Sequence, residues 1–233
     1  MKITGFQKIT LQDYPDHISS MLFTQGCNMR CPFCQNSSLI NMEGNSYIDE
    51  NEILEFLNSR KKMVNGLIIS GGEPTVQFDL KDFIKKVKEN IKIDIKLDTN
   101  GINYKVLKEL IDEKLIDYVA MDIKNTFLKY DETSGVKNIS IENIKKSIEY
   151  LKERYVDYEF RTTVISDYHN LQDILEIINY IGADSKYYLQ NFKMSEDVID
   201  KNLKEIPSNK LELWNKVLKK YKNVYIRGMD KEE

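Results

Sequence analysis

Residues 92–124, KIDIKLDTNGINYKVLKELIDEKLIDYVAMDIK, decide the fold class. The segment opens with an apolar–polar alternation over 92–101, continues with a helical pattern over 104–114, and returns to an alternation over 117–124. A period of two predicts strands, whereas apolar residues spaced three and four apart predict a helix. A strand, a helix and a strand in this order predict a βαβ unit with parallel strands and a right-handed crossover.

The same order extends in both directions along the chain. We expect further strands over 18–26, 66–72, 157–165, 186–192 and 223–228, and further helices over 49–60, 79–90, 140–154, 170–182 and 209–221. Asp79 and Ser140 stand where two of these helices should have their N-caps. About six strand–helix units point to a full or partial (β/α) barrel. A doubly wound open sheet is the alternative, and periodicity does not separate the two. Because no linker or repeat is visible, we expect one domain over residues 1–233.

Charged residues occupy one face of each of the two alternating strands. The first strand carries Asp94, Lys96 and Asp98, and the second carries Asp122 and Lys124. If helices cover the outer face of the sheet, these side chains point into the barrel. Charges there are costly unless they are paired or solvated, so the pattern favours a wet ligand cavity over a packed interior.

Composition excludes several classes of function. The chain has 233 residues, 41% hydrophobic and 30% charged, and a net charge of −3 from 34 basic and 37 acidic residues. This balance offers no basic surface for nucleic acid or a membrane. The N-terminus MKITGFQKIT lacks the apolar run of a signal peptide, and no apolar stretch approaches the length of a membrane span. We therefore expect a cytoplasmic protein, in which clustered cysteines are more often metal ligands or catalytic groups than disulfides.

The three cysteines of the chain stand together in GCNMRCPFCQN, residues 26–36. Cys27, Cys31 and Cys34 have the spacing C-x3-C-x2-C and follow the strand expected over 18–26. A 4Fe–4S cluster takes one ligand per iron, so three cysteines leave one iron open to a small molecule. The alternatives are a zinc site completed by a histidine, and simply buried thiols. Neither His17 nor His169 has the close spacing of a zinc knuckle or finger.

These residues carry a resemblance to a known family. The cysteine spacing, with Phe33 before the last cysteine, resembles the motif of the radical S-adenosylmethionine (SAM) superfamily. The stretches DYPDHISSMLFTQGCNMRCPFCQN, ISGGEPT, KLDTNG, DYVAMDIK, EFRTTV and YYLQNF are similar to activating enzymes of glycyl radical enzymes. Within that group the chain most resembles the activating proteins of anaerobic ribonucleoside-triphosphate reductases.

The resemblance implies a fold and a reaction. It implies a partial (β/α)6 barrel of the TIM type, with one 4Fe–4S cluster per chain on Cys27, Cys31 and Cys34. SAM would chelate the open iron, and one electron from the reduced cluster would split it into methionine and a 5′-deoxyadenosyl radical. That radical would remove a hydrogen atom from a glycine of a partner glycyl radical enzyme. The expected partner is an anaerobic ribonucleotide reductase, with a pyruvate formate-lyase-type enzyme as alternative. Flavodoxin or ferredoxin is the expected low-potential electron donor.

The resemblance also assigns contacts to SAM. It places Gly71, Gly72 and Glu73 of SGGEPT against the amino group of SAM; taken alone, this stretch is equally well an ordinary Gly–Pro loop. Phe33 is expected beside the adenine or as a shield of the cluster, and Gln190 near the ribose or adenine.

A second group of expected contacts is charged or polar. Asp98, Thr99, Asp122 and Lys124 end the two alternating strands, and Arg161 shares strand parity with Glu159 and Thr163. Two carboxylates in one cavity repel unless a cation lies between them. Lys124 is one candidate, and the resemblance suggests another, a bound monovalent cation near Asp98 and Asp122. The guanidinium of Arg161 would fit a carboxylate of SAM or of Glu73. The alternative is a solvated charge ladder on an edge strand.

Two other functions remain open from the sequence. One is a radical SAM enzyme that acts on a small molecule such as a pterin precursor. The other is a zinc-binding interaction module without catalysis. Because one cluster takes all three cysteines, no second cluster can be bound by cysteine in this chain.

Overall fold

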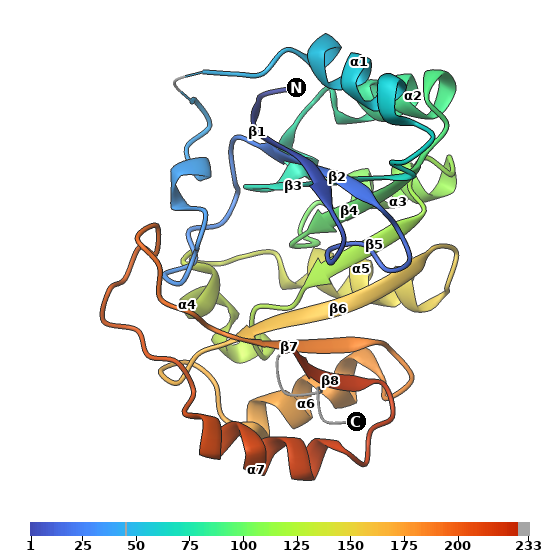
Figure 1. Ribbon diagram of the computed structural model, residues 1–233. Helices are drawn as coiled ribbons and strands as arrows, with labels where there is room; N and C mark the ends of the chain where they lie inside the picture. Colours follow the sequence, from blue (N-terminus) through green and yellow to red (C-terminus); the bar gives the residue numbers. More distant parts are fainter. Residues whose placement is uncertain (45, 228–233) are drawn as a thin grey trace.

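The computed structural model describes residues 1–44 and 46–227, and its strands form one sheet in the order of the sequence (Figure 1). β1 pairs antiparallel with β2, and every later strand pairs parallel with the strand before it. The strands are β1 (Ile3–Thr10), β2 (Ser19–Thr24), β3 (Gly66–Gly71), β4 (Asp94–Thr99), β5 (Tyr118–Asp122), β6 (Asp157–Val164), β7 (Tyr187–Asn191) and β8 (Val224–Arg227).

Each parallel pair of strands is joined by a helix. The connecting helices are α1 (Glu50–Arg60), α2 (Leu80–Asn90), α3 (Tyr104–Asp112), α5 (Ile141–Lys152), α6 (Leu171–Ile181) and α7 (Ser208–Leu218). The short helix α4 (Tyr130–Ser134) lies in the connection between β5 and α5. None of the helices among the described residues is long and apolar enough to cross a membrane.

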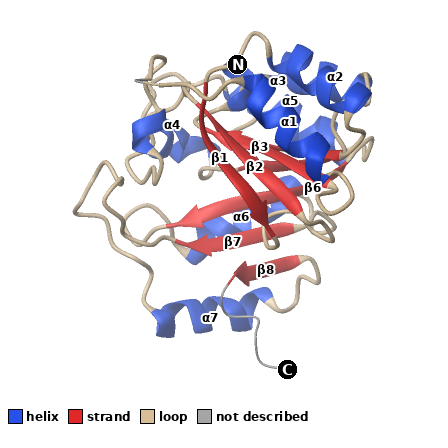
Figure 2. Cartoon of the chain, turned by 45° about the horizontal axis from the view of Figure 1, so that its top comes forward, coloured by secondary structure: helices blue, strands red, loops and turns tan. Residues whose placement is uncertain are grey.

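The order of the strands separates the barrel from the doubly wound alternative. In a doubly wound sheet the strand order reverses, and helices cover both faces. Here the order never reverses, so right-handed crossovers place the helices on one face of a curved sheet (Figure 2). Among the described residues no ladder joins β8 to β1 or β2, which leaves the barrel open on one side. The predicted partial (β/α)6 barrel is confirmed.

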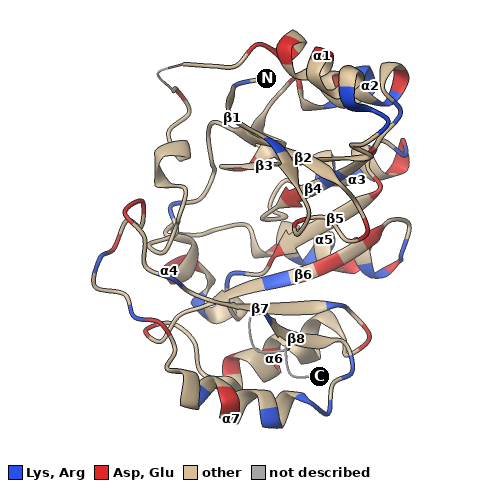
Figure 3. Cartoon of the chain, viewed as in Figure 1, with Lys and Arg blue, Asp and Glu red and all other residues tan. Residues whose placement is uncertain are grey.

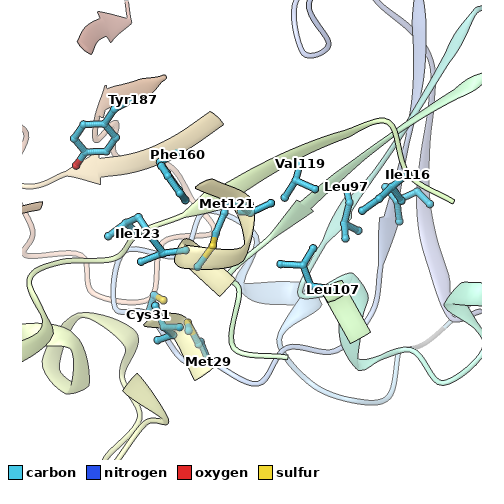
Figure 4. Close-up of a cluster of buried hydrophobic side chains, with 14 of the residues drawn as sticks. Met29, Cys31, Leu97, Leu107, Ile116, Val119, Met121, Ile123, Phe160 and Tyr187 are labelled. Atoms are coloured by element: carbon cyan, nitrogen blue, oxygen red, sulfur yellow. The ribbon is translucent and has the colours of Figure 1, made fainter. Parts of the chain in front are cut away.

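The apolar core lies between the outer face of the sheet and the helices. Leu97 of β4 and Val119 of β5 pack toward Leu107 of α3, and all three are fully buried (Figure 4). Burial of one such side chain stabilises the fold by roughly 1.5–3 kcal/mol. The opposite face of β4 carries Lys96 and Asp98, as the alternation predicts.

The inner side of the barrel is polar only toward the carboxyl ends of the strands. Toward their amino ends, Tyr14, Met21, Ile68 and Tyr118 form a separate apolar cluster. The expectation of a wet interior is therefore correct for one half of the barrel, and aromatic and aliphatic side chains fill the other half.

Several local expectations need correction. β1 and α4 were not expected from the sequence. Asp79 and Ser140 do precede α2 and α5, but neither side chain makes a capping hydrogen bond. The carboxylate of Asp79 instead pairs with the α-amino group of Met1 at 2.7 Å. The expected closing strand 223–228 is found as β8, and its last residue lies outside the described residues.

Candidate active site

A cavity of about 240 Å³ lies where the strands of the barrel end. Its wall combines the cysteine loop after β2 with the carboxyl ends of β3 to β7, which is where barrels of this type build their active sites. The wall contains every residue that the sequence assigned to the cluster or to SAM: Cys27, Cys31, Phe33, Cys34, Gly71, Gly72, Glu73, Asp98, Thr99, Asp122, Lys124, Arg161 and Gln190.

Backbone hydrogen bonds hold the cysteine loop over the cavity. The amide of Cys27 donates to the carbonyl of Ile40 at 3.0 Å, and the amide of Arg30 donates to the carbonyl of Ser134 at 2.8 Å. The second bond ties the loop to the end of α4. All three cysteines are free thiols, with Cys31 buried and the other two half-buried. Burial, with a smaller effect from the charge of Glu73, raises the pKa of Cys27 to about 12.

Gly71 and Gly72 bring two chain segments into contact. A Cβ on Gly71 would stand 2.2 Å from the amide nitrogen of Thr24, and one on Gly72 would stand 2.2 Å from the carbonyl oxygen of Gly26. Gly71 also has a φ of +125°, which side-chain-bearing residues rarely adopt. These glycines let β3 and its following turn pack against β2 and the cysteine loop. Their expected role toward the amino group of SAM stays a prediction.

Glu73 joins the ends of β3 and β4. Its Oε1 accepts hydrogen bonds from the backbone and hydroxyl of Thr75 and from the hydroxyl of Thr99, and its Oε2 accepts from the amide of Asn100 at 2.7 Å. The side chain is almost fully buried, and this burial raises the pKa of Glu73. No ion pair between Glu73 and Arg161 is found among the described residues, so the expectation that Arg161 could serve Glu73 is not met.

Arg161 lies between the two aspartates instead. Its Nε donates to Asp122 Oδ1 at 2.9 Å, and its Nη1 stands 3.5 Å from Asp98 Oδ2. Lys124 Nζ donates to Asp122 Oδ2 at 3.1 Å, so the expected pairing of this lysine is present as well. Burial alone would raise the pKa of Asp122, but the two adjacent cations outweigh it and lower that pKa well below its usual range. Asp98, Asp122 and Arg161 lie on β4, β5 and β6, in the middle of the sheet, and not on a solvated edge. Figure 3 shows charged residues of both signs on these strands.

Two buried side chains fix the end of β5 from outside the cavity. The hydroxyl of Tyr130 accepts from the amide of Lys124 at 3.3 Å, and His169 Nε2 donates to the carbonyl of Lys124 at 2.9 Å. His169 Nδ1 accepts from the amide of Ile165, so the ring is neutral with its proton on Nε2. Burial lowers the pKa of His169, which favours this neutral form. His169 thus lies before α6 and supports the end of β5 without lining the cavity.

Sequence reasoning missed part of the wall. Also lining the cavity are Met29, Gln35, Asn36, Ile40, Ser70, Asn100 and Thr163. Thr163 could have been found from its parity with Arg161. Asn100 stands in the quoted DTNG stretch and donates to the side chain of Asn28 at 2.7 Å, which links the end of β4 to the cysteine loop. The remaining residues carry no signal of their own, because the loop conformation places them.

The donor set of the cavity fits an iron–sulfur cluster. Three thiols line it, and no histidine does. Among residues 1–44 and 46–227, no three His, Cys, Asp or Glu side chains converge closely enough to hold a single metal ion. Thiolates are the usual ligands of iron–sulfur clusters. The zinc alternative needs a histidine to complete the site, and neither His17 nor His169 is among the residues that line the cavity.

Comparison with known proteins agrees with this chemistry. The model of the family described as the radical SAM superfamily matches residues 21–181. A Methanocaldococcus jannaschii protein described as "Putative glycyl-radical enzyme activating enzyme" is 34% identical over 238 residues, covering 98% of this chain and 96% of that one. A Methanococcus aeolicus protein described as "Probable GTP 3′,8-cyclase" is 27% identical, covering 90% of this chain and 76% of that one.

A solved structure shares the fold. Streptococcus suis SuiB bound to the precursor peptide SuiA superposes with a TM-score of 0.70 at 20% identity, covering 88% of this chain and 47% of that longer one. At this identity the likeness concerns the fold alone. From the family match and the relative of nearly equal length, it follows that this chain belongs to the radical SAM superfamily and is a radical SAM enzyme, a family that implies a 4Fe–4S cluster and SAM.

Proposed function

We propose that this protein activates a glycyl radical enzyme by removing a hydrogen atom from a glycine of that partner. The observation that carries the proposal is the 34% identity to the M. jannaschii relative described as such an activating enzyme, over 98% of this chain and 96% of the relative. The alignment with the cyclase covers 76% of that relative, so it leaves a larger part of the relative unmatched than the alignment with the activating enzyme does.

The residues of the cavity have separate tasks in this proposal. Cys27, Cys31 and Cys34 hold the cluster and leave one iron for SAM. When bound, the cluster and SAM would together supply the one-electron cleavage of SAM to methionine, and the hydrogen atom taken from the glycine of the partner would complete 5′-deoxyadenosine. Arg161 and Lys124, the two cations of this wall, present positive charge to the carboxylate of SAM.

Further residues of the wall orient the rest of SAM. Glu73 Oε2 accepts one hydrogen bond within the protein, which leaves it able to accept another from the amino group of SAM. Phe33 and Gln190 lie in the same wall, where they border the nucleoside. Thr99 keeps Glu73 in place through its hydroxyl, at 2.7 Å.

The open side of the barrel supports a protein substrate. Because no ladder closes the sheet between β8 and β1 among the described residues, a loop of a partner can approach without unfolding the barrel. We infer that the partner is an anaerobic ribonucleotide reductase, with a pyruvate formate-lyase-type enzyme as second choice. We also infer a flavodoxin or ferredoxin as electron donor, and a cytoplasmic location. The free thiols of all three cysteines support a reducing compartment.

The experiment is a comparison of substrates under anaerobic conditions. The reconstituted, reduced protein is mixed with SAM and with either the reductase, the formate-lyase-type enzyme or GTP, and electron paramagnetic resonance spectra are recorded. We expect the doublet of a glycyl radical with the reductase. A doublet only with the formate-lyase-type enzyme would keep the activase and overturn the partner. Turnover of GTP without a doublet would reject the activase in favour of the cyclase class, which the second relative represents.

A further inference from the structure

Lys96 is a lysine inside the barrel to which the proposed function gives no role. It lies on β4, two residues before Asp98 and on the same face of the strand. The residue is 2% exposed, and it is the one lysine that is buried among the described residues. Burying an ammonium group is costly unless it is paired and hydrogen-bonded. Its partner is Asp98 Oδ1, to which Lys96 Nζ donates at 2.8 Å.

With Lys96 included, every carboxylate oxygen of the two aspartates faces a cationic side chain. The four pairs are Lys96 Nζ with Asp98 Oδ1 at 2.8 Å, Arg161 Nη1 with Asp98 Oδ2 at 3.5 Å, Arg161 Nε with Asp122 Oδ1 at 2.9 Å, and Lys124 Nζ with Asp122 Oδ2 at 3.1 Å. The sheet itself fixes this arrangement. Neighbouring strands in register bring Asp122 opposite Arg161, and the alternation of β4 points Lys96 and Asp98 to the same side.

We propose that Lys96 is a built-in counter-ion that takes the place of a bound monovalent cation beside Asp98 and Asp122, so that SAM binding does not depend on sodium or potassium ions. The proposal departs from the expectation that the family resemblance raised. It concerns the positioning of Asp98 and the charge of the wall, not the removal of hydrogen.

Two physical arguments favour the ammonium group over a metal ion. A monovalent metal ion needs several oxygen ligands, and here each carboxylate oxygen already accepts a charge-assisted contact. In addition, an extra cation between the aspartates would stand next to Arg161 and the two lysines. Three cations already face two carboxylates, and like charges in a buried site disfavour one another.

The test measures SAM binding as a function of the monovalent cation. Calorimetric titration of SAM into the oxidised holoprotein is done in buffers that contain tetramethylammonium, sodium or potassium as the only monovalent cation, at equal ionic strength. We expect the dissociation constant of the unaltered protein to stay constant within about twofold. A tightening of about tenfold or more in sodium or potassium would overturn the proposal, because it would show a required metal ion.

A variant sharpens the test. Lys96→Met keeps the apolar stem and removes the charge, so Asp98 Oδ1 loses its partner. We expect SAM to bind about tenfold more weakly, and we expect potassium, sodium or methylammonium to restore the affinity. Lys96→Arg should retain affinity in all buffers. The matched control is Lys88→Met, which removes the partner of Asp117 outside the cavity and should leave SAM binding unchanged.

The cation dependence distinguishes a counter-ion from a merely structural lysine. If Lys96→Met melts at the temperature of the unaltered protein and binds SAM equally well in every buffer, Lys96 is not a counter-ion. If the variant loses affinity and no small cation restores it, the lysine acts by packing, and the proposal is equally rejected. Because binding is measured without a partner protein, either failure leaves the proposed activase function untouched.

Discussion

Arg161→Met is the substitution that tests the charged wall most severely. The guanidinium contacts Asp122 at 2.9 Å and Asp98 at 3.5 Å, and its side chain is 12% exposed. Removing one partner of a buried ion pair costs about 3–5 kcal/mol. Each aspartate keeps a lysine, so we expect the lower end, about 3 kcal/mol. For a chain of this length the melting temperature should fall by about 6–12 °C.

The assay is thermal unfolding of the reconstituted protein at pH 7, followed by circular dichroism. Arg60→Met serves as the control, because Arg60 is exposed at the end of α1 and removing it should change the melting temperature little. A melting temperature of Arg161→Met within about 1 °C of the unaltered protein would refute the claim that Arg161 neutralises two buried carboxylates, since it corresponds to well under 1 kcal/mol.

The pH dependence of this effect has a defined sign. The folded-state pKa of Asp122 lies below its ordinary value of 3.8. Its ionised form therefore contributes stability that is fully present above that value and is lost as the pH falls through the lower folded-state pKa. Without Arg161 the carboxylates accept protons more readily. Protonation at low pH then removes their unfavourable charge and reduces the free-energy cost of the substitution. The difference in melting temperature should therefore be full from pH 7 down to about 4, and should narrow as the pH falls below 3.8, where this contribution is lost.

Three further substitutions test other parts of the site. Cys31→Ser, like the same change at the other two cysteines, should lose most of the iron and sulfide that the reconstituted protein binds, and retention of both would contradict the ligand assignment. Lys124→Met should keep near-normal iron content but bind SAM about tenfold more weakly in calorimetric titration, because one cation of the wall is lost. Gly72→Ala places a methyl group against the carbonyl of Gly26, so its melting temperature should fall by the equivalent of about 1–3 kcal/mol, and an unchanged value would show that the turn can move.

The parallel part of the fold was predictable because its strands are buried in a regular pattern. The alternation in β4 and β5 reports which face meets the helices, and the structure places Leu97 and Val119 there. β1 carried no such signal. It is an antiparallel edge strand with Gly5 in its interior, and its exposed residues are Gln7, Lys8 and Ile9 in succession. Its pairing with β2, rather than a pattern of its own, therefore makes it a strand.

The members of the site were predictable from motifs, but their partners were not. Asp98, Asp122 and Arg161 were each expected in the cavity, yet the salt bridges between them depend on strand register, which the sequence does not state. Lys96 stands in the same alternation as Asp98, and the contact between their side chains becomes visible only in the folded structure. The hydrogen bonds that hold the carboxylate of Glu73 likewise join the ends of two different strands, so no local sequence pattern could show them.

The most direct test of the account follows one hydrogen atom. The partner reductase is prepared with glycine that carries deuterium on its α-carbon, and it is incubated anaerobically with the reduced protein and SAM. The 5′-deoxyadenosine that forms is then analysed by mass spectrometry. We expect one deuterium atom in this product, together with the doublet of a glycyl radical on the reductase. Formation of 5′-deoxyadenosine without deuterium, and without the radical on the reductase, would contradict it.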